Sequence, residues 1–222
     1  MSIFSNIQAI RENILPNVRM VCVSKFHPNE AIQEAYEIGE RIFGESKVQD
    51  LCKKRKELAG DISWHFIGHL QTNKVKDIVP FVELIHGVDS FKLLTEINMQ
   101  GSKIERKINC LLQVHIAQEE TKFGFDEQEL YEMLNNGQWK GYKHIVICGL
   151  MGMATFTDNT GQIRLEFRKL KRIFDKVKKD FFAGDCSFTE LSMGMSDDYQ
   201  IAMEEGSTLV RIGTTIFGQR EY

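Results

Sequence analysis

The chain has 222 residues, of which 42% are hydrophobic and 27% charged, which is enough for one sizeable hydrophobic core. A formal net charge of -3 creates no global field that would recruit nucleic acid or an anionic membrane. No apolar run approaches the roughly 20 residues of a membrane span, and five scattered cysteines without C-x-x-C spacing favour reduced thiols in a cytoplasm over disulfides or zinc.

The N-terminal stretch predicts a helix rather than a signal peptide. Ile3, Ile7, Ile10 and Ile14 recur at helical spacing, and no basic leader precedes them. Without a proline-rich or low-complexity linker anywhere in the chain, we expect a single domain spanning residues 1–222.

Short apolar runs alternate with amphipathic stretches along the rest of the chain. The clearest amphipathic stretch places apolar residues at helical spacing from Ile163 to Phe181. Strands that are apolar throughout, each followed by a helix, indicate a parallel sheet covered on its faces. Eight such runs favour an α/β fold with one closed (β/α)₈ TIM-type barrel, its extra N-terminal helix capping the bottom, over the alternative of an open doubly wound sheet. The eight runs are 18–24, 41–44, 64–68, 82–87, 108–116, 144–151, 188–194 and 208–213.

Lys25 stands at the C-terminal end of the first run, before Pro28, which is well placed to open a helix. Active sites of such barrels lie at the C-terminal strand ends. A lysine held there can present a neutral amine to a carbonyl group. The alternative interpretation is a lysine that extends outward from the rim into water.

Two loops near the other end of the chain carry polar groups suited to phosphate. In "RIGTT", Gly213 lets the backbone approach a ligand, and Thr214 offers a hydroxyl and an amide. The last two strand–helix loops are where barrels usually bind phosphate. We expect the loop at 213–214 to hold most of it with help from the Ser196 hydroxyl, although Ser196 could instead be a simple helix N-cap.

Arg211 lies two residues before Gly213, in the last strand. A buried arginine needs an acceptor, which either a core salt bridge or a ligand at the barrel mouth could supply. A strand-end lysine, this arginine and a phosphate loop together suggest pyridoxal 5'-phosphate (PLP) as cofactor.

Several motifs closely resemble the YggS/PROSC family of pyridoxal phosphate homeostasis proteins. The motifs are "VSKFHP", "FGES-x-VQ", "WHFIGHLQTNK", "TKFG", "GLM" and "LSMGMSDDYQIAMEEGSTLVRIGTTIFG". The resemblance implies a barrel like the N-terminal domain of alanine racemase, with a Schiff base on Lys25. It also implies phosphate contacts at Ser196, Gly213 and Thr214, and Arg211 facing the pyridine nitrogen.

The chain departs from the family pattern at two places. Ser46 and Lys47 replace the asparagine and tyrosine of the usual "FGENY", and Phe123 replaces a serine. The first change leaves open whether Ser46 contacts the cofactor in place of the asparagine. Neither departure falls in the motifs that contain Lys25 or the expected phosphate-binding residues.

His65 and His69 have a spacing of four, but they lie in a strand and loop without a nearby carboxylate, so no metal site is predicted. We expect His65 to line the barrel mouth, partly buried. No Ser–His–acid triad can be identified from spacing alone.

Two classes of function remain, a PLP carrier or regulator and a racemase-type enzyme. Only nine residues follow Gly213, so we expect no second domain to supply an opposing acid–base group. A cationic Arg211 at the ring nitrogen would also weaken the electron sink. The sequence therefore predicts a cytoplasmic, monomeric PLP homeostasis protein that is not an efficient enzyme, has no catalytic residues, and has PLP-dependent apoenzymes as its possible protein partners.

Overall fold

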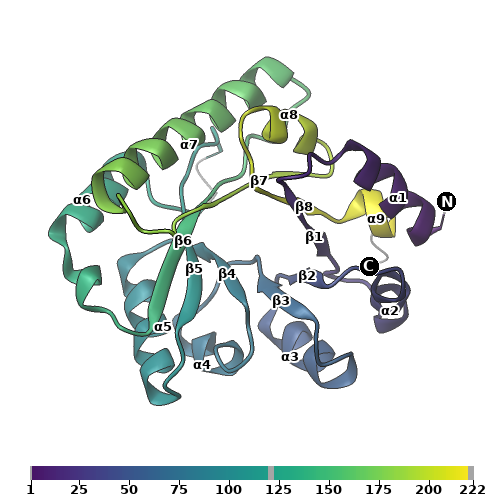
Figure 1. Ribbon diagram of the computed structural model, residues 1–222, viewed down its shortest axis with the longest axis horizontal. Coiled ribbons are helices and arrows are strands. Elements are labelled where there is room, and N and C mark those ends of the chain that lie inside the picture. The colour runs from purple at the N-terminus through teal and green to yellow at the C-terminus, as the bar shows by residue number, and fades with distance from the viewer. Residues whose placement is uncertain (1, 120–122, 220–222) are drawn as a thin grey trace.

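A computed structural model describes residues 2–119 and 123–219 of the chain. Within these residues, eight parallel strands close into a barrel in chain order, each pairing with the next and β8 with β1 (Figure 1). The strands are β1 Arg19–Val23, β2 Ile42–Glu45, β3 Ser63–Phe66, β4 Leu84–Val88, β5 Ile108–Gln113, β6 Ile145–Met151, β7 Glu190–Met195 and β8 Leu209–Ile212. Each strand overlaps one of the eight predicted runs, in the same order. The predicted (β/α)₈ barrel is therefore confirmed.

Helices surround this barrel in the described part of the chain. The longest, α7, begins one turn before the apolar repeat that predicted it and ends at Phe181. The α-helices are α1 Ile3–Asn13, α2 Asn29–Glu37, α3 Val48–Glu57, α4 Val75–Ile78, α5 Phe91–Lys103, α6 Glu127–Asn136, α7 Thr160–Phe181, α8 Tyr199–Glu204 and α9 Thr214–Phe217, and the 3₁₀ turns are η1 Thr72–Lys74 and η2 Gln138–Gly141.

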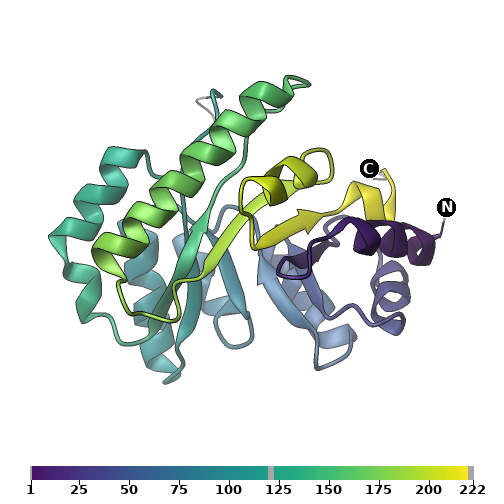
Figure 2. The same ribbon diagram turned by 45° about the horizontal axis from the view of Figure 1, so that its top comes forward.

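The placement of α1 at the bottom of the barrel was a wrong prediction. The helix lies on the side of the barrel, beside α2 and α9, as Figures 1 and 2 both show. Ile7 and Ile10 are buried there, and the Asn6 side-chain amide donates to the Ile216 carbonyl at 2.9 Å. Because α9 is only one turn long, it cannot cover the β8–β1 face alone, and α1 completes the cover.

Two apolar clusters separate the inside of the barrel from its outside. The large cluster joins strands to helices, with Ile32, Leu51 and Phe167 among its members. The buried residues of the small cluster all belong to strands, which places this cluster inside the barrel: Val21, Leu84, Leu111, Met151 and Leu209.

Side chains alternate across each strand, so residues two positions after this inner cluster also point inward. His86 follows Leu84 in this way, and Arg211 follows Leu209. The barrel interior therefore changes from apolar to polar toward the C-terminal ends of the strands. That end is where the candidate site lies.

Candidate functional site

A cavity of about 370 Å³ opens at the C-terminal end of the barrel. It brings together all five residues predicted as site residues, Lys25, Ser196, Arg211, Gly213 and Thr214. The β1–β8 pairing explains this meeting, because it sets Val21 beside Arg211 and Cys22 beside Ile212. The remaining lining residues are Val23, His27, Ile67, Met153, Phe156, Met195 and Asp197.

Lys25 lies in a tight turn directly after β1. The His27 amide donates to the Ser24 carbonyl at 3.1 Å across this turn. Phe26, between them, has a φ of 69°, a left-handed conformation that is rare for a bulky residue. Strained residues of this kind persist where the surroundings hold them, and they gather at binding sites.

A buried ion pair anchors the residue before Lys25. The Ser24 hydroxyl donates to Glu45 Oε1 at 2.7 Å, and Lys54 Nζ donates to the same oxygen at 2.7 Å and to the Ser24 carbonyl at 2.9 Å. Glu45 and Ser24 are fully buried and Lys54 nearly so. Burial raises the pKa of the Glu45 carboxyl, and the Lys54 charge opposes that rise.

Sequence reasoning missed this pair, although a signal was present. Lys54 falls three residues after Leu51 on the buried face of α3, a position where an apolar residue is expected. Glu45 ends an otherwise apolar strand. An acid and a lysine that both replace core residues point to a buried pair.

Ser196 connects the two predicted phosphate loops. Its Oγ accepts from the Gly213 amide at 3.2 Å and from the Thr215 amide at 3.4 Å. The alternative role as a helix N-cap is not the one observed, because α8 begins at Tyr199 with Asp198 at its N-cap position. Two backbone amides of the loop after β8 thus donate to the hydroxyl of the loop after β7.

Gly213 is packed closely against β1. A Cβ at this position would lie 3.1 Å from the Val23 carbonyl oxygen and 3.2 Å from the Val23 Cβ. A side chain at this position would therefore require the Val23 backbone or the 213–214 loop to shift by a few tenths of an ångström.

Arg211 is 4% exposed and has no carboxylate within ion-pair distance among the described residues. Its Nη1 donates to Ser192 Oγ at 2.6 Å, and its Nη2 donates to the Gly152 carbonyl at 3.1 Å. Burial lowers its pKa to about 10, so the guanidinium stays charged at neutral pH. A guanidinium has five N–H donors, so this one keeps donors for an acceptor in the cavity that it lines.

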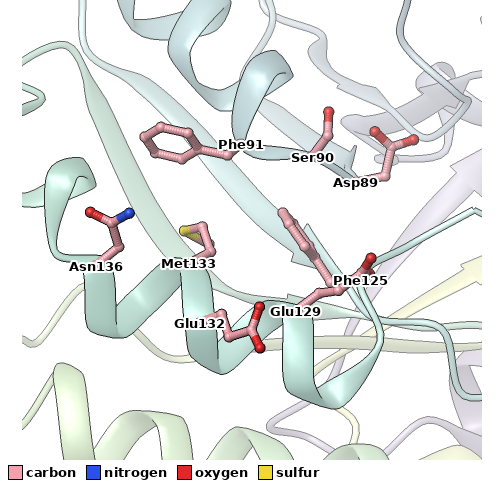
Figure 3. A pocket seen from close by; sticks show the side chains of 8 residues that line it. All are labelled: Asp89, Ser90, Phe91, Phe125, Glu129, Glu132, Met133 and Asn136. Carbon is pink, nitrogen blue, oxygen red and sulfur yellow. The ribbon is translucent and has the colours of Figure 1, made fainter.

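A second hollow, of about 360 Å³, lies between α5 and α6 (Figure 3). Its polar lining includes the carboxylates of Asp89, Glu129 and Glu132 and no lysine or arginine among the described residues. The barrel-mouth cavity instead has Lys25 and Arg211 against the one carboxylate of Asp197. Of the two hollows, only the barrel-mouth cavity has charges suited to an anionic ligand.

The histidines lie elsewhere than predicted. His65 is buried inside the barrel, 3.0 Å from His86, rather than at the mouth. His69 does have a carboxylate beside it, since its Nδ1 lies 2.8 Å from Asp89 Oδ2, and its ring stacks on Phe123. Among the described residues no three potential metal ligands gather. Ser46, left open above, is not among the residues lining the barrel-mouth cavity.

The chain matches the family described as "Alanine racemase, N-terminal domain" over residues 2–221. It is 38% identical over 205 residues to the "Pyridoxal phosphate homeostasis protein" of Aquifex aeolicus, covering 92% of this chain and 88% of that protein. The protein of the same name from Synechocystis sp. is 36% identical over 221 residues, covering 99% and 98%.

Solved structures give the same result. PipY of Synechococcus elongatus, "with PLP bound", superposes with a TM-score of 0.88 at 33% identity, covering 98% of this chain and 100% of that one. An alanine racemase of Clostridium difficile superposes with a TM-score of 0.75 at 11% identity, and this chain spans 56% of it. That second likeness concerns the fold alone.

Proposed function

Because the chain belongs to the alanine racemase N-terminal domain family and, within it, to the pyridoxal phosphate homeostasis proteins, we propose that its barrel-mouth cavity binds pyridoxal 5'-phosphate. One observation carries the proposal most directly. Lys25 and the Ser196–Gly213–Thr214 elements, far apart in sequence, line the same cavity together with a buried arginine that lacks an ion-pair partner in the described chain.

The residues present fit the groups of this cofactor. The Ser196 hydroxyl, whose oxygen accepts from the Gly213 and Thr215 amides, can donate its proton to a phosphate, and the Thr214 hydroxyl is a second donor in the same cavity. Lys25 supplies an amine that can bond to the aldehyde carbon with loss of water. Arg211 would direct a remaining N–H at the ring nitrogen, an acceptor when unprotonated. When bound, PLP supplies a reactive aldehyde and an electron-withdrawing ring.

The phosphate contribution can be measured by titration. Pyridoxal, which lacks the phosphate, should bind far more weakly than PLP. Thr214→Ala should weaken PLP binding roughly ten- to a hundredfold, because it removes one hydrogen bond to a charged group. Thr160→Ala, an exposed threonine at the start of α7 outside the cavity, is the matched control. Equal binding of pyridoxal and PLP would refute the assigned phosphate site.

The curated relatives are named for homeostasis and not for a reaction, and we assign the same role to this chain: holding and supplying PLP. The proposed position of the ring favours a non-catalytic role, because a charged Arg211 at the ring nitrogen would disfavour protonation there. Without that proton the ring withdraws electrons less well, and carbanion chemistry slows.

The alternative, a racemase-type enzyme, makes a distinct prediction. We expect the PLP-loaded protein, incubated with L-alanine in deuterated water, to show neither solvent exchange at Cα nor loss of chirality at ordinary enzymatic rates. NMR and chiral chromatography over hours would measure both, with an authentic alanine racemase as positive control. Turnover that Lys25→Ala abolishes would favour the enzyme over the carrier.

We further propose that residues 1–222 form a single domain, that the protein acts as a cytoplasmic monomer, and that PLP-dependent apoenzymes are its partners. The described helices include none long and apolar enough to cross a membrane. All five cysteines are free, which supports a reducing compartment. A solution mass near 25.6 kDa by light scattering would support the monomer, and twice that mass would contradict it.

A further inference from the structure

A chain of hydrogen bonds crosses the barrel interior beneath the cavity. Arg211 Nη1 of β8 contacts Ser192 Oγ of β7 at 2.6 Å, and Ser192 Oγ lies 3.0 Å from His86 Nδ1 of β4. His86 Nε2 then lies 3.0 Å from His65 Nδ1 of β3. Exposed fractions are 0% for Ser192 and His86, 2% for His65 and 4% for Arg211.

The direction of donation along these hydrogen bonds follows from Arg211, the first residue in the series. A guanidinium can only donate, so Ser192 Oγ accepts from Arg211. The Ser192 hydroxyl proton then has a single remaining partner among the described side chains, His86 Nδ1. If His86 Nδ1 carried a proton instead, the Ser192 proton would be buried without an acceptor, which is unfavourable.

Each histidine is therefore restricted to one tautomer. Burial lowers the pKa of both rings, so both are neutral at pH 7. With Nδ1 accepting, the proton of His86 is on Nε2, and it is donated to His65 Nδ1. His65 in turn carries its proton on Nε2. The order of donation is Arg211 to Ser192 to His86 to His65.

We propose that Ser192 and His86 are positioning residues that hold the Arg211 guanidinium in one orientation, with its remaining donors aimed into the cavity. His86 Nδ1 accepts a hydrogen bond from the Ser192 hydroxyl, and this orients a Ser192 lone pair toward Arg211 Nη1. The Gly152 carbonyl, directly after β6, accepts from Nη2 and fixes the other end of the guanidinium. The part of this inference that concerns the ligand rests on the proposed PLP binding; the donation order does not.

The order of donation can be tested without any ligand. In the ¹⁵N-labelled protein, ring spectra at neutral pH should show His65 and His86 protonated at Nε2 and unprotonated at Nδ1. The chain has six histidines, so the other four serve as internal references. A His86 ring protonated at Nδ1, or a doubly protonated ring at either position, would overturn the assignment.

The positioning role is tested by comparing PLP with its 1-deaza analogue, which has a carbon in place of the ring nitrogen. The wild-type protein should prefer PLP by about tenfold, the equivalent of one hydrogen bond to a charged group. Ser192→Ala and His86→Leu should each reduce that preference to about one. His86→Asn, which places an acceptor oxygen near the position of Nδ1, should restore it.

These measurements separate the two proposals. If the wild-type protein binds neither compound, the proposed function fails, while the ring spectra still decide the donation order. If the wild type prefers PLP and Ser192→Ala keeps the full preference, the positioning role is refuted. Ser192→Ala removes a single oxygen, so it provides this answer even if His86→Leu does not fold.

Discussion

Borohydride treatment of the PLP-loaded protein is expected to place the pyridoxyl group on Lys25, and Lys25→Ala should retain no cofactor after reduction and denaturation. The lysine lies in a turn at the barrel mouth and lines the cavity that also contains Arg211 and Gly213. In the proposed function, this amine would react with the aldehyde of a ligand held at Ser196 and Gly213. Peptide mass mapping of the reduced protein measures the result.

Lys47 provides the matched control for this experiment. It is exposed, and its Nζ lies 4.8 Å from the centre of the Phe26 ring, close to the same turn but outside the cavity lining. Lys47→Ala should leave the labelling of Lys25 unchanged. A pyridoxyl group found chiefly on Lys47 or another lysine would contradict the assignment of Lys25.

Replacing Lys54 by methionine should lower the free energy of unfolding by about 3–5 kcal/mol near neutral pH. The change removes the only cation paired with Glu45 among the described residues and leaves a carboxylate with 0% exposure. It also removes the donor to the Ser24 carbonyl, so PLP binding at the adjacent Lys25 should weaken in parallel. Chemical denaturation at constant ionic strength measures the stability change.

The loss should depend on pH in a defined direction. Burial raises the pKa of Glu45, so the folded protein binds this proton more tightly than the unfolded chain. The associated stability is complete below the unfolded pKa and is lost as pH rises through the folded pKa. Lys54→Met removes the charge that opposes the rise, so its deficit should be larger at about pH 8 than at about pH 5.

Lys53→Met, on the exposed face of the same helix, is the control and should change stability by less than about 0.5 kcal/mol. Pairing Lys54→Met with Glu45→Gln should recover part of the loss, because no buried charge then remains. A deficit that is the same at both pH values, or one shared by Lys53→Met, would contradict the buried-pair explanation.

The barrel was predictable because parallel strands covered on both faces are apolar throughout, and each such run is visible locally. The same local information placed Lys25 after the first strand and Gly213 after the last. Once the fold is a closed barrel, these two positions must be neighbours, since β1 pairs with β8. The prediction of which residues meet therefore depended on topology and not on side-chain detail.

The errors concern contacts that no local pattern encodes. The spacing of Ile7 and Ile10 predicts a helix but not the surface that it covers, which depends on the short length of α9. His65 was expected at the mouth because it lies in a polar stretch that leads from a strand into a loop. Its partner His86 belongs to the next strand, and only the register of the barrel brings the two rings together.

The pairing of β1 with β8 makes ligand binding depend on the completed fold. Lys25 follows β1, whereas Ser196 follows β7 and Gly213 follows β8, so the proposed PLP site is complete only when the barrel has closed. A ligand that contacts the ends of both strands stabilises their pairing. At a free concentration one hundred times its Kd it adds about 2.7 kcal/mol to the stability of the closed barrel. Loss of the bound cofactor would therefore also remove this added stability from the pairing of the first and last strands.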